Sequence, residues 1–254
     1  MAEDNNKKTA TNSGNGQQAK IGDQMNFAAS EAYKMLRTNL MFSFSDTECK
    51  VIGVTSSVKS EGKSTTSINL AYTLGEQGYK VLLIEGDMRM PGISKQLGIN
   101  SVPGISNLLS GMTNKVADVL RQKVFNNVDF IPAGENVPNP AELLGSNRMK
   151  ATLDGLQKIY EHIIIDLAPV TVVSDPLVVS KYLKGMVLVV RHEVAEQKQV
   201  AEAVRLLKFS NVRILGFIYN AYSGNSGAYS KKYYKSYGYG YGEKSKKNSE
   251  KNKK

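Results

Sequence analysis

The chain has 254 residues, with 33 Lys and Arg against 23 Asp and Glu, which gives a formal net charge of +10. The charge is unevenly spread, because residues 222–254 hold nine lysines and two acids and so carry +7 of it. The rest of the chain is therefore not a nucleic-acid-binding surface by charge alone, and we expect no nucleic-acid partner. A single cysteine, Cys49, excludes an internal disulfide and suits a reducing cytosol.

The length allows one α/β domain. Residues 1–20 contain no apolar stretch of the kind that a secretory signal needs. The longest apolar runs, such as residues 186–190, have the length of a strand rather than of a membrane span. We therefore expect a cytoplasmic protein that reaches a membrane only through a partner or through its basic tail.

Residues 1–26 are rich in Asn, Gln, Thr and Lys and are predicted to form a disordered N-terminal segment. A helix is expected to begin near Phe27, and short apolar runs then alternate with helical patterns. The predicted strands are residues 50–56, 80–87, 128–134, 162–168, 185–190 and 213–220, and the predicted helices are 64–78, 147–160 and 195–209. Continuously apolar strands indicate burial on both faces. The sequence therefore predicts a doubly wound α/β domain with a mostly parallel sheet over residues 27–221, followed by a flexible Tyr-rich and Lys-rich tail over residues 222–254.

The segment between the first predicted strand and the helix at 64–78 resembles the second half of a phosphate-binding loop. Backbone N–H groups at a helix start can cradle phosphates, a lysine can offer a point charge to the outer phosphate oxygens, and a serine hydroxyl can bind Mg²⁺. Ser57 stands where a strict Walker A motif has glycine, so a chance match at a helix start is the alternative. The predicted nucleotide-binding residues of this segment are Ser57, Ser60, Glu61, Gly62, Lys63, Ser64 and Thr65.

Acidic residues end two further predicted strands. Glu85 and Asp87 stand at the end of the strand predicted at 80–87. Asp166 follows the three isoleucines of the strand predicted at 162–168. Ligands of open α/β sheets bind at the carboxyl ends of the strands, so we expect these acids to converge on the loop at 57–65. On its own, Asp166 would be an ordinary strand-end residue. Together with the loop, the acids predict an ATP site whose Mg²⁺ is held by Ser64, Asp87 and Asp166.

The tail concentrates tyrosines that a folded core does not need. An aromatic low-complexity segment that binds nucleic acid is one interpretation, and a cluster of phosphate acceptors is the other. The second applies only if the rest of the chain transfers phosphoryl groups. The predicted acceptors are Tyr229, Tyr233, Tyr234, Tyr237, Tyr239 and Tyr241.

The loop ending GKST, the acidic motif LLIEGDMRMP, the strand IIID and the tyrosine cluster together resemble the bacterial tyrosine kinases of capsular and exopolysaccharide synthesis. The resemblance covers residues 27–241 and implies a P-loop NTPase fold of the MinD/ParA-like kind. It also implies an ATP-dependent protein-tyrosine kinase that phosphorylates its own tail and regulates polysaccharide synthesis. Glu85 departs from the family, which usually has Asp there, but the carboxylate is kept.

The resemblance also implies roles for single residues. Lys63, Asp87 and Glu85 are the predicted catalytic residues. Lys63 would hold the triphosphate, while Asp87 with Glu85 would orient the incoming tyrosine near the transferred group. Asn220 would bind the adenine, with an ordinary strand-end Asn as the alternative. Arg89 has two interpretations, a phosphate contact or pairing with the neighbouring acids.

The segment EAYKMLR at 31–37 resembles the family's oligomerisation motif Glu-x-x-Arg-x-x-Arg. Glu31, Lys34 and Arg37 fall within one helix face, which predicts a homo-oligomeric ring formed through this helix and the tail. Solvated surface charges are the alternative. Relatives are activated by a membrane-bound polysaccharide co-polymerase, so the resemblance implies an activator as a separate chain and recruitment to the inner face of the plasma membrane. A protein-tyrosine phosphatase is the expected counterpart.

Two other functions compete with this interpretation. An ATP-switched dimerising ATPase of the MinD/ParA-like group would share the fold without kinase activity. That group has a signature lysine five residues before the loop lysine, where this chain has Val58, with Lys59 one position off. A module that binds RNA or anionic membrane through its tail would need no ATP.

Overall fold

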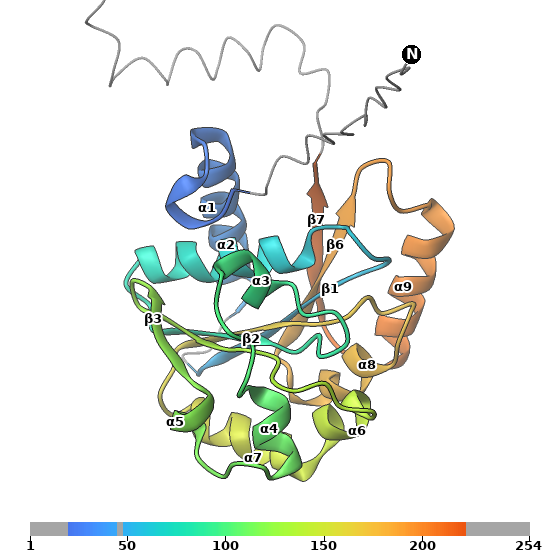
Figure 1. Ribbon diagram of the computed structural model, residues 1–254. Coiled ribbons are helices and arrows are strands. Elements are labelled where there is room, and N and C mark those ends of the chain that lie inside the picture. The colour runs from blue at the N-terminus through green and yellow to red at the C-terminus, as the bar shows by residue number, and fades with distance from the viewer. Residues whose placement is uncertain (1–19, 45–47, 222–254) are drawn as a thin grey trace, which may run out of the picture.

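The computed structural model describes residues 20–44 and 48–221 and places a seven-stranded sheet at the centre of the molecule (Figure 1). The strand order is β3-β4-β2-β5-β1-β6-β7, and every neighbouring pair is parallel except β3 with β4. The strands are β1 (Lys50–Ser56), β2 (Val81–Glu85), β3 (Arg121–Phe125), β4 (Val128–Ile131), β5 (His162–Asp166), β6 (Gly185–Arg191) and β7 (Ile214–Asn220). This sheet confirms the predicted doubly wound α/β fold.

Helices cover both faces of the sheet, with α1, α2 and α3 on one face and α4 to α9 on the other (Figure 1). The α-helices are α1 (Phe27–Phe42), α2 (Lys63–Glu76), α3 (Ile93–Leu97), α4 (Ile105–Ser110), α5 (Val116–Val119), α6 (Pro140–Gly145), α7 (Asn147–Leu156), α8 (Asp175–Val179) and α9 (Gln197–Phe209). Two 3₁₀ turns, η1 (Gly22–Gln24) and η2 (Ser180–Tyr182), complete the order. None of the helices described is both long enough and apolar enough to span a membrane.

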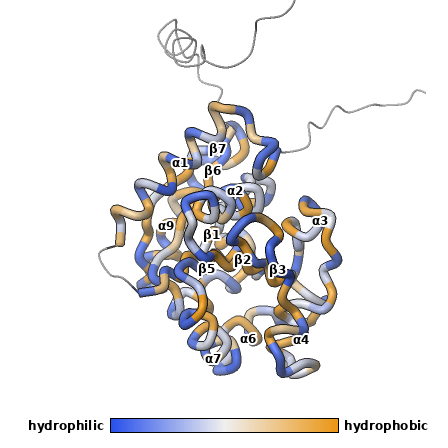
Figure 2. Tube along the Cα trace, turned by 90° about the vertical axis from the view of Figure 1, so that its left-hand side faces the viewer, coloured by the Kyte–Doolittle hydropathy of each residue, from blue (hydrophilic) through white to orange (hydrophobic). Residues whose placement is uncertain are grey.

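Two apolar cores hold the helices to the sheet because the side chains of each strand alternate between its faces. On β1, Val51 belongs to the core under α7 and α9, whereas Ile52 and Val54 belong to the core under α1 and α2. Every residue of β2 and β5 is buried. Figure 2 accordingly shows hydrophobic colouring along the central strands. Burial of each large apolar side chain contributes about 1.5–3 kcal/mol, so these runs are the main anchor of the fold.

The chain just before α1 is ordered, which corrects one predicted boundary. Gly22 is buried, and its N–H donates to Asn69 Oδ1 of α2 at 3.0 Å. The predicted disordered segment 1–26 therefore extends too far along the chain, because Lys20 and Gly22 already bond to Asn69 of α2. Residues 1–19 of that segment lie outside the described residues.

The parallel strands end together at one edge of the sheet, and this edge positions the candidate site. The register pairs Glu85 of β2 with Asp166 of β5, and Arg191 of β6 with Asn220 of β7. The loop that leaves β1 enters α2 at the same edge. The residues singled out in the sequence are therefore neighbours across strands, as the topology requires.

Candidate functional site

Residues 57–62 form a tight loop between β1 and α2, here called the phosphate loop. Its backbone is left-handed at Ser60, with φ 65°, and at Gly62, with φ 90°. At Gly62 a side chain would also collide, because a Cβ there would lie 2.2 Å from Asn220 Nδ2. Lys63 begins α2, so the first N–H groups of a 14-residue helix open at the end of the loop. Such an end attracts anions, because its N–H groups lack partners within the helix and the helix dipole is positive there.

The shape of the phosphate loop is fixed by β6 and β7. The buried Glu61 carboxylate accepts hydrogen bonds from Ser57 Oγ at 2.8 Å, from Val58 N at 2.7 Å and from Arg191 N at 3.1 Å. Asn220 Nδ2 donates to the Glu61 carbonyl oxygen at 2.8 Å. The Glu61 carboxylate thus holds the loop from inside, and the predicted nucleotide contact of Glu61 stays a prediction. The predicted adenine contact of Asn220 stays a prediction, since its amide N–H group serves the loop here.

Lys63, Asp87 and Asp166 converge directly beside the phosphate loop. Lys63 Nζ lies 2.8 Å from Asp87 Oδ2 and 3.6 Å from Asp166 Oδ2. Ser64 Oγ donates to Asp166 Oδ2 at 2.6 Å, and Ser67 Oγ donates to Asp166 Oδ1 at 3.1 Å. Ser67 was not predicted, although its place one turn after Ser64 on α2 puts it on the same helix face.

The charged side chains of this centre are buried, and they comprise two carboxyl groups and one ammonium group. Asp166 is fully buried, Asp87 is 2% exposed and the Lys63 side chain is 12% exposed. Burial alone would lower the pKa of Lys63, but the charges of Asp166 and Asp87 outweigh it and raise that pKa. Burial raises the pKa of Asp166, against the opposing effects of Lys63 and the Ser64 hydroxyl. Two carboxylates thus share one ammonium group, and the excess negative charge favours a further cation.

The donors suit Mg²⁺ bound together with a nucleotide. Within the described ranges, no three His, Cys, Asp or Glu side chains gather closely enough to hold a metal ion by themselves. Mg²⁺ does not need such a cage, because it takes one or two carboxylates and completes its shell with water and substrate phosphates. Two carboxylates and a serine hydroxyl at a helix start fit that requirement.

Glu85 does not join Asp87 and Asp166 around Lys63. Its carboxylate accepts hydrogen bonds from Ile93 N at 2.6 Å, from Ser94 N at 3.2 Å and from Ala133 N at 3.2 Å, and also from Ser94 Oγ. The expected convergence of all three acids on the phosphate loop is therefore wrong for Glu85. Its predicted catalytic role is not supported by any of these contacts and stays a prediction.

Arg89 forms a bidentate ion pair with Asp175, with Nε–Oδ2 at 2.8 Å and Nη2–Oδ1 at 3.0 Å. Of the two interpretations of Arg89, pairing is what the structure has, but the partner is Asp175 at the start of α8 and not the neighbouring acids. Asp175 is fully buried and was missed by the sequence analysis. The signal was Asp175 followed by Pro176, because an acidic residue and a proline are typical of a first helical turn.

The remaining predicted loop residues contact neighbouring elements. Thr65 Oγ1 donates to Gln96 Oε1 of α3 at 2.9 Å, and the Ser60 carbonyl oxygen accepts from Arg191 Nη1 at 3.1 Å. The Ser57 carbonyl oxygen accepts from Thr171 Oγ1 at 2.5 Å. These three partners could not be predicted from local sequence patterns, because each lies far along the chain.

The three predicted interface residues of α1 do not share one environment. Lys34 Nζ pairs with Glu31 Oε1 at 2.9 Å, and both side chains are more than two-fifths exposed. Arg37 instead donates from Nη1 to the Thr73 carbonyl oxygen of α2 at 2.6 Å. All six predicted acceptor tyrosines lie outside the described residues.

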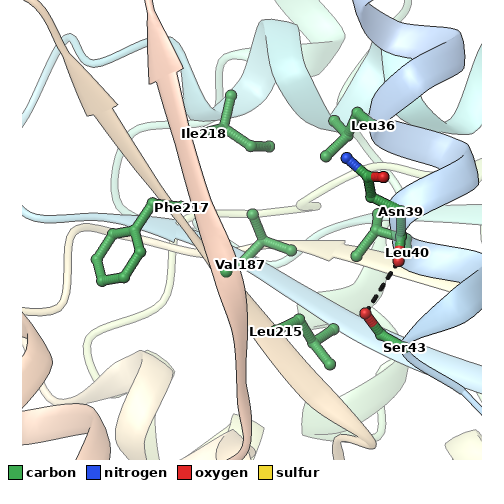
Figure 3. Close-up of a pocket in the computed structure, with 9 residues that line it drawn as sticks. Leu36, Asn39, Leu40, Ser43, Val187, Leu215, Phe217 and Ile218 are labelled. Carbon is green, nitrogen blue, oxygen red and sulfur yellow. Dashed lines mark hydrogen bonds between the residues drawn. The ribbon is translucent and has the colours of Figure 1, made fainter.

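A cavity of about 160 Å³ lies between α1 and β7, away from the phosphate loop, and Figure 3 shows Leu36 and Ile218 on its two sides. Leu40, Val187 and Leu215 also line it, and Ser43 Oγ donates to the Asn39 carbonyl oxygen at its rim. None of its lining residues is ionisable. It is therefore unsuited to bind a phosphate.

Comparison with known proteins agrees with this geometry. Residues 49–214 match the model of a family described as an AAA domain. The tyrosine-protein kinase YwqD of Bacillus subtilis is 33% identical over 191 residues, covering 75% of this chain and 80% of that protein. The kinase domain of the Escherichia coli tyrosine kinase ETK superposes with a TM-score of 0.74 at 31% identity, covering 79% of each chain. The septum site-determining protein MinD of Pyrococcus horikoshii, solved with Mg-ADP, superposes with a TM-score of 0.58 at 27% identity, covering 69% of this chain and 71% of that one.

The sheet, the phosphate loop and these matches define a nucleotide-binding P-loop NTPase. Within that class the chain belongs to the bacterial tyrosine-protein kinases, and it is an enzyme of that type. The ATPase alternative without kinase activity is not favoured, because the kinase domain superposes better than the septum-site protein.

Proposed function

We propose that this kinase transfers the γ-phosphoryl group of Mg-ATP to the tyrosines of residues 229–241 and thereby regulates capsular or exopolysaccharide synthesis. The observation that carries the proposal is the convergence of Lys63, Ser64, Asp87 and Asp166 at the start of α2. Phosphoryl transfer depends mainly on positioning and charge neutralisation, and these four side chains supply both.

Each group has a specific part in this proposal. Lys63 and the N–H groups of the phosphate loop hold the triphosphate, while Ser64, Asp87 and Asp166 hold Mg²⁺, which neutralises the charge that develops on the phosphates. Asp87 Oδ2 already faces Lys63, and Oδ1 is fixed by Met90 N at 3.0 Å, so this carboxylate is held in place. An oriented carboxylate can accept the phenolic proton of a tyrosine, whose ordinary pKa is about 10.

The position of β7 supports the tail as the substrate. Asn220 contacts the phosphate loop, and the tail begins two residues later, so the acceptors are tethered beside the site. Tyr229 follows Asn220 by nine residues, a stretch that spans at most about 30 Å, and later tyrosines reach further. The tethered tyrosines are thus available to the chain's own site or to that of a neighbouring subunit.

Phosphorylation would reverse the charge of the tail. Each phosphate adds roughly −1.5 to −2 at pH 7, so six would add roughly −9 to −12 to a segment that starts near +7. We propose that this reversal disassembles a homo-oligomeric ring formed through α1 and the tail. The exposed Glu31 and Lys34 support an interface there, whereas Arg37 is engaged within its own chain.

We also propose a place and partners for the enzyme, on the strength of the family resemblance. It acts in the cytoplasm at the inner face of the plasma membrane, where a membrane-bound polysaccharide co-polymerase, as a separate chain, activates it. A protein-tyrosine phosphatase resets the tail. The cytoplasmic segment of such an activator therefore belongs in any activity assay.

The test is a phosphotyrosine assay of the purified full chain with Mg-ATP and an activator segment. Wild type should become modified, whereas Lys63→Met and a chain truncated after Asn220 should not. Lys158→Met is the control, because Lys158 is an exposed lysine that precedes β5, at the edge of the sheet opposite the site, and it should keep wild-type labelling. We expect Lys63→Met to lose at least about 100-fold in rate. A wild-type protein that stays unmodified, or a Lys63→Met protein that is modified normally, would contradict the proposal.

A further inference from the structure

Glu85 is a buried carboxylate whose acceptor capacity is used by the protein itself. It is fully buried at the end of β2, and its two oxygens accept three backbone N–H groups and one serine hydroxyl. Among the described residues it takes part in no ion pair. A buried carboxylate stabilised by backbone donors needs no metal ion to offset the cost of its burial.

The donors of Glu85 come from two parts of the chain, the start of α3 and the segment that follows β4. Ile93 and Ser94 begin α3, and Ala133 follows β4. Glu85 therefore holds the start of α3 beside the ends of β2 and β4 through hydrogen bonds. Loss of this carboxylate would leave the two N–H groups of α3 buried without partners, at about 1–3 kcal/mol each.

Helix α3 in turn contacts the start of α2, directly after the phosphate loop. Gln96 Oε1 accepts from Thr65 Oγ1 at 2.9 Å. At Gly92 the approach is so close that a Cβ would lie 3.0 Å from Ser64 Oγ. Ser64 is the residue whose hydroxyl meets Asp166. A shift of α3 would therefore be transmitted to the hydroxyl that the proposed function assigns to Mg²⁺.

We infer that Glu85 is a positioning residue, which fixes α3 and through it Ser64 and Thr65, and that it is neither a metal ligand nor the group that receives the tyrosine proton. The inference rests on the proposed function and refines it, because it leaves Asp87 and Asp166 as the acids of the reaction. It also explains why position 85 holds a glutamate rather than the aspartate that is usual in the family. The pairing of β2 with β5 fixes the Glu85 backbone, and an aspartate would stop about 1.5 Å short of donors that now lie at hydrogen-bond distance.

The two conservative variants of Glu85 separate the possible roles. Glu85→Gln keeps the reach and an acceptor oxygen for Ile93 N and Ser94 N, and its amide N–H can donate to Ser94 Oγ. Of the four donors, only Ala133 N, at 3.2 Å, loses its acceptor. Glu85→Asp keeps the charge but loses the reach. A positioning residue therefore predicts that Glu85→Asp is the more damaging change, whereas a metal ligand or proton acceptor predicts that Glu85→Gln is.

The primary measurement is the Kd of the full-length protein for a fluorescent ATP analogue with Mg²⁺, and the rate of tail phosphorylation is the second. We expect a Kd within about threefold of wild type for Glu85→Gln and about 10–100 times higher for Glu85→Asp, as for other side chains that orient binding groups. Saturating Mg-ATP should restore most of the rate of both. Asp129→Asn is the matched control, because Asp129 also accepts a backbone N–H and a hydroxyl but lies away from the loop, on β4.

The milder variant Ser94→Ala keeps the test decisive if the Glu85 variants fold poorly. It removes one donor to Glu85 and should raise the Kd about two- to fivefold, with less than additive effect when combined with Glu85→Asp. A Kd unchanged in Ser94→Ala relative to Asp129→Asn would overturn the inference. So would a Glu85→Gln protein that loses 100-fold or more in rate while Glu85→Asp stays active, which is the signature of direct acid–base chemistry. If wild type binds Mg-ATP but makes no phosphotyrosine, the proposed function fails while the Kd series still decides the role of Glu85.

Discussion

Asn220 illustrates how a single side chain can be assigned by its contacts rather than by its position. Its amide N–H donates to the phosphate loop, so Asn220→Ala should loosen the loop and weaken every ligand that places phosphates there. Loss of one hydrogen bond predicts a two- to tenfold higher Kd for ATP, GTP and inorganic triphosphate alike. Competition of each ligand against a fluorescent ATP analogue gives these constants.

The control for this variant is Asn100→Ala, because the Asn100 side chain accepts a hydrogen bond from the nearby Val102 N–H and not from the phosphate loop. It should bind all three ligands normally. If Asn220→Ala weakened ATP but left GTP and triphosphate unchanged, the contact would be to the adenine, as the family resemblance implied.

At the residue scale the sequence predicted the members of the site better than their roles. Lys63, Ser64 and Asp166 could be placed because their spacing reflects local requirements, namely a helix start and a strand end. The partners of Glu85 and Arg89 could not be placed, because Ser94 and Asp175 come from short helices whose positions depend on tertiary packing. The sequence therefore shows which residue types stand at the strand ends, but it does not show which donor forms a hydrogen bond with which acid.

At the element scale, α1 adds a polar contact with α2 to its apolar packing. The Thr73 carbonyl is one of the last four carbonyl groups of α2, which lack hydrogen-bond partners within the helix. Arg37 donates a hydrogen bond to it. Arg37→Ala should therefore lower the free energy of unfolding by about 1–2 kcal/mol. Lys34→Ala should lower it by less than about 0.5 kcal/mol, because the Lys34–Glu31 pair is exposed. Urea unfolding measures both.

The same two variants test the predicted interface. Light scattering should show a smaller assembled mass for Lys34→Ala, while Arg37→Ala acts first on stability. An Arg37→Ala protein with wild-type stability and a reduced assembled mass would mean that Arg37 serves the interface and not α2.

The elements themselves were predictable where their pattern is long and apolar. The strands β1, β2 and β5 and the helices α2 and α9 follow from continuous burial or a clear helical period. Strand β3 was missed, because Arg121–Phe125 lies at the sheet edge, where no residue is fully buried. The short helix α3 was missed for another reason, since its first N–H groups bind Glu85, eight residues earlier at the end of β2, rather than a capping side chain next to the helix.

At the scale of the whole molecule, His162 makes stability depend on pH. It begins β5 and is buried, and its Nδ1 has no hydrogen-bond partner among the described residues. Burial, assisted by the charge of Lys50, lowers the pKa of His162 from 6.5 to about 4. The folded state therefore favours the neutral ring. Its contribution is fully present above pH 6.5 and is lost as the pH falls from 6.5 towards 4.

A difference of this size corresponds to about 3 kcal/mol, since each pKa unit is worth about 1.4 kcal/mol. The free energy of unfolding of wild type should thus fall more steeply between pH 7 and pH 4.5 than that of His162→Leu, which removes the titrating ring. Tyr79→Phe, which alters the ring packed edge-on against His162 but keeps the histidine, should retain the wild-type slope. Urea unfolding at several pH values measures all three. Parallel slopes for wild type and His162→Leu would mean that the buried imidazole takes up no proton on unfolding, so that the acid sensitivity of the fold would have to arise from its carboxylates.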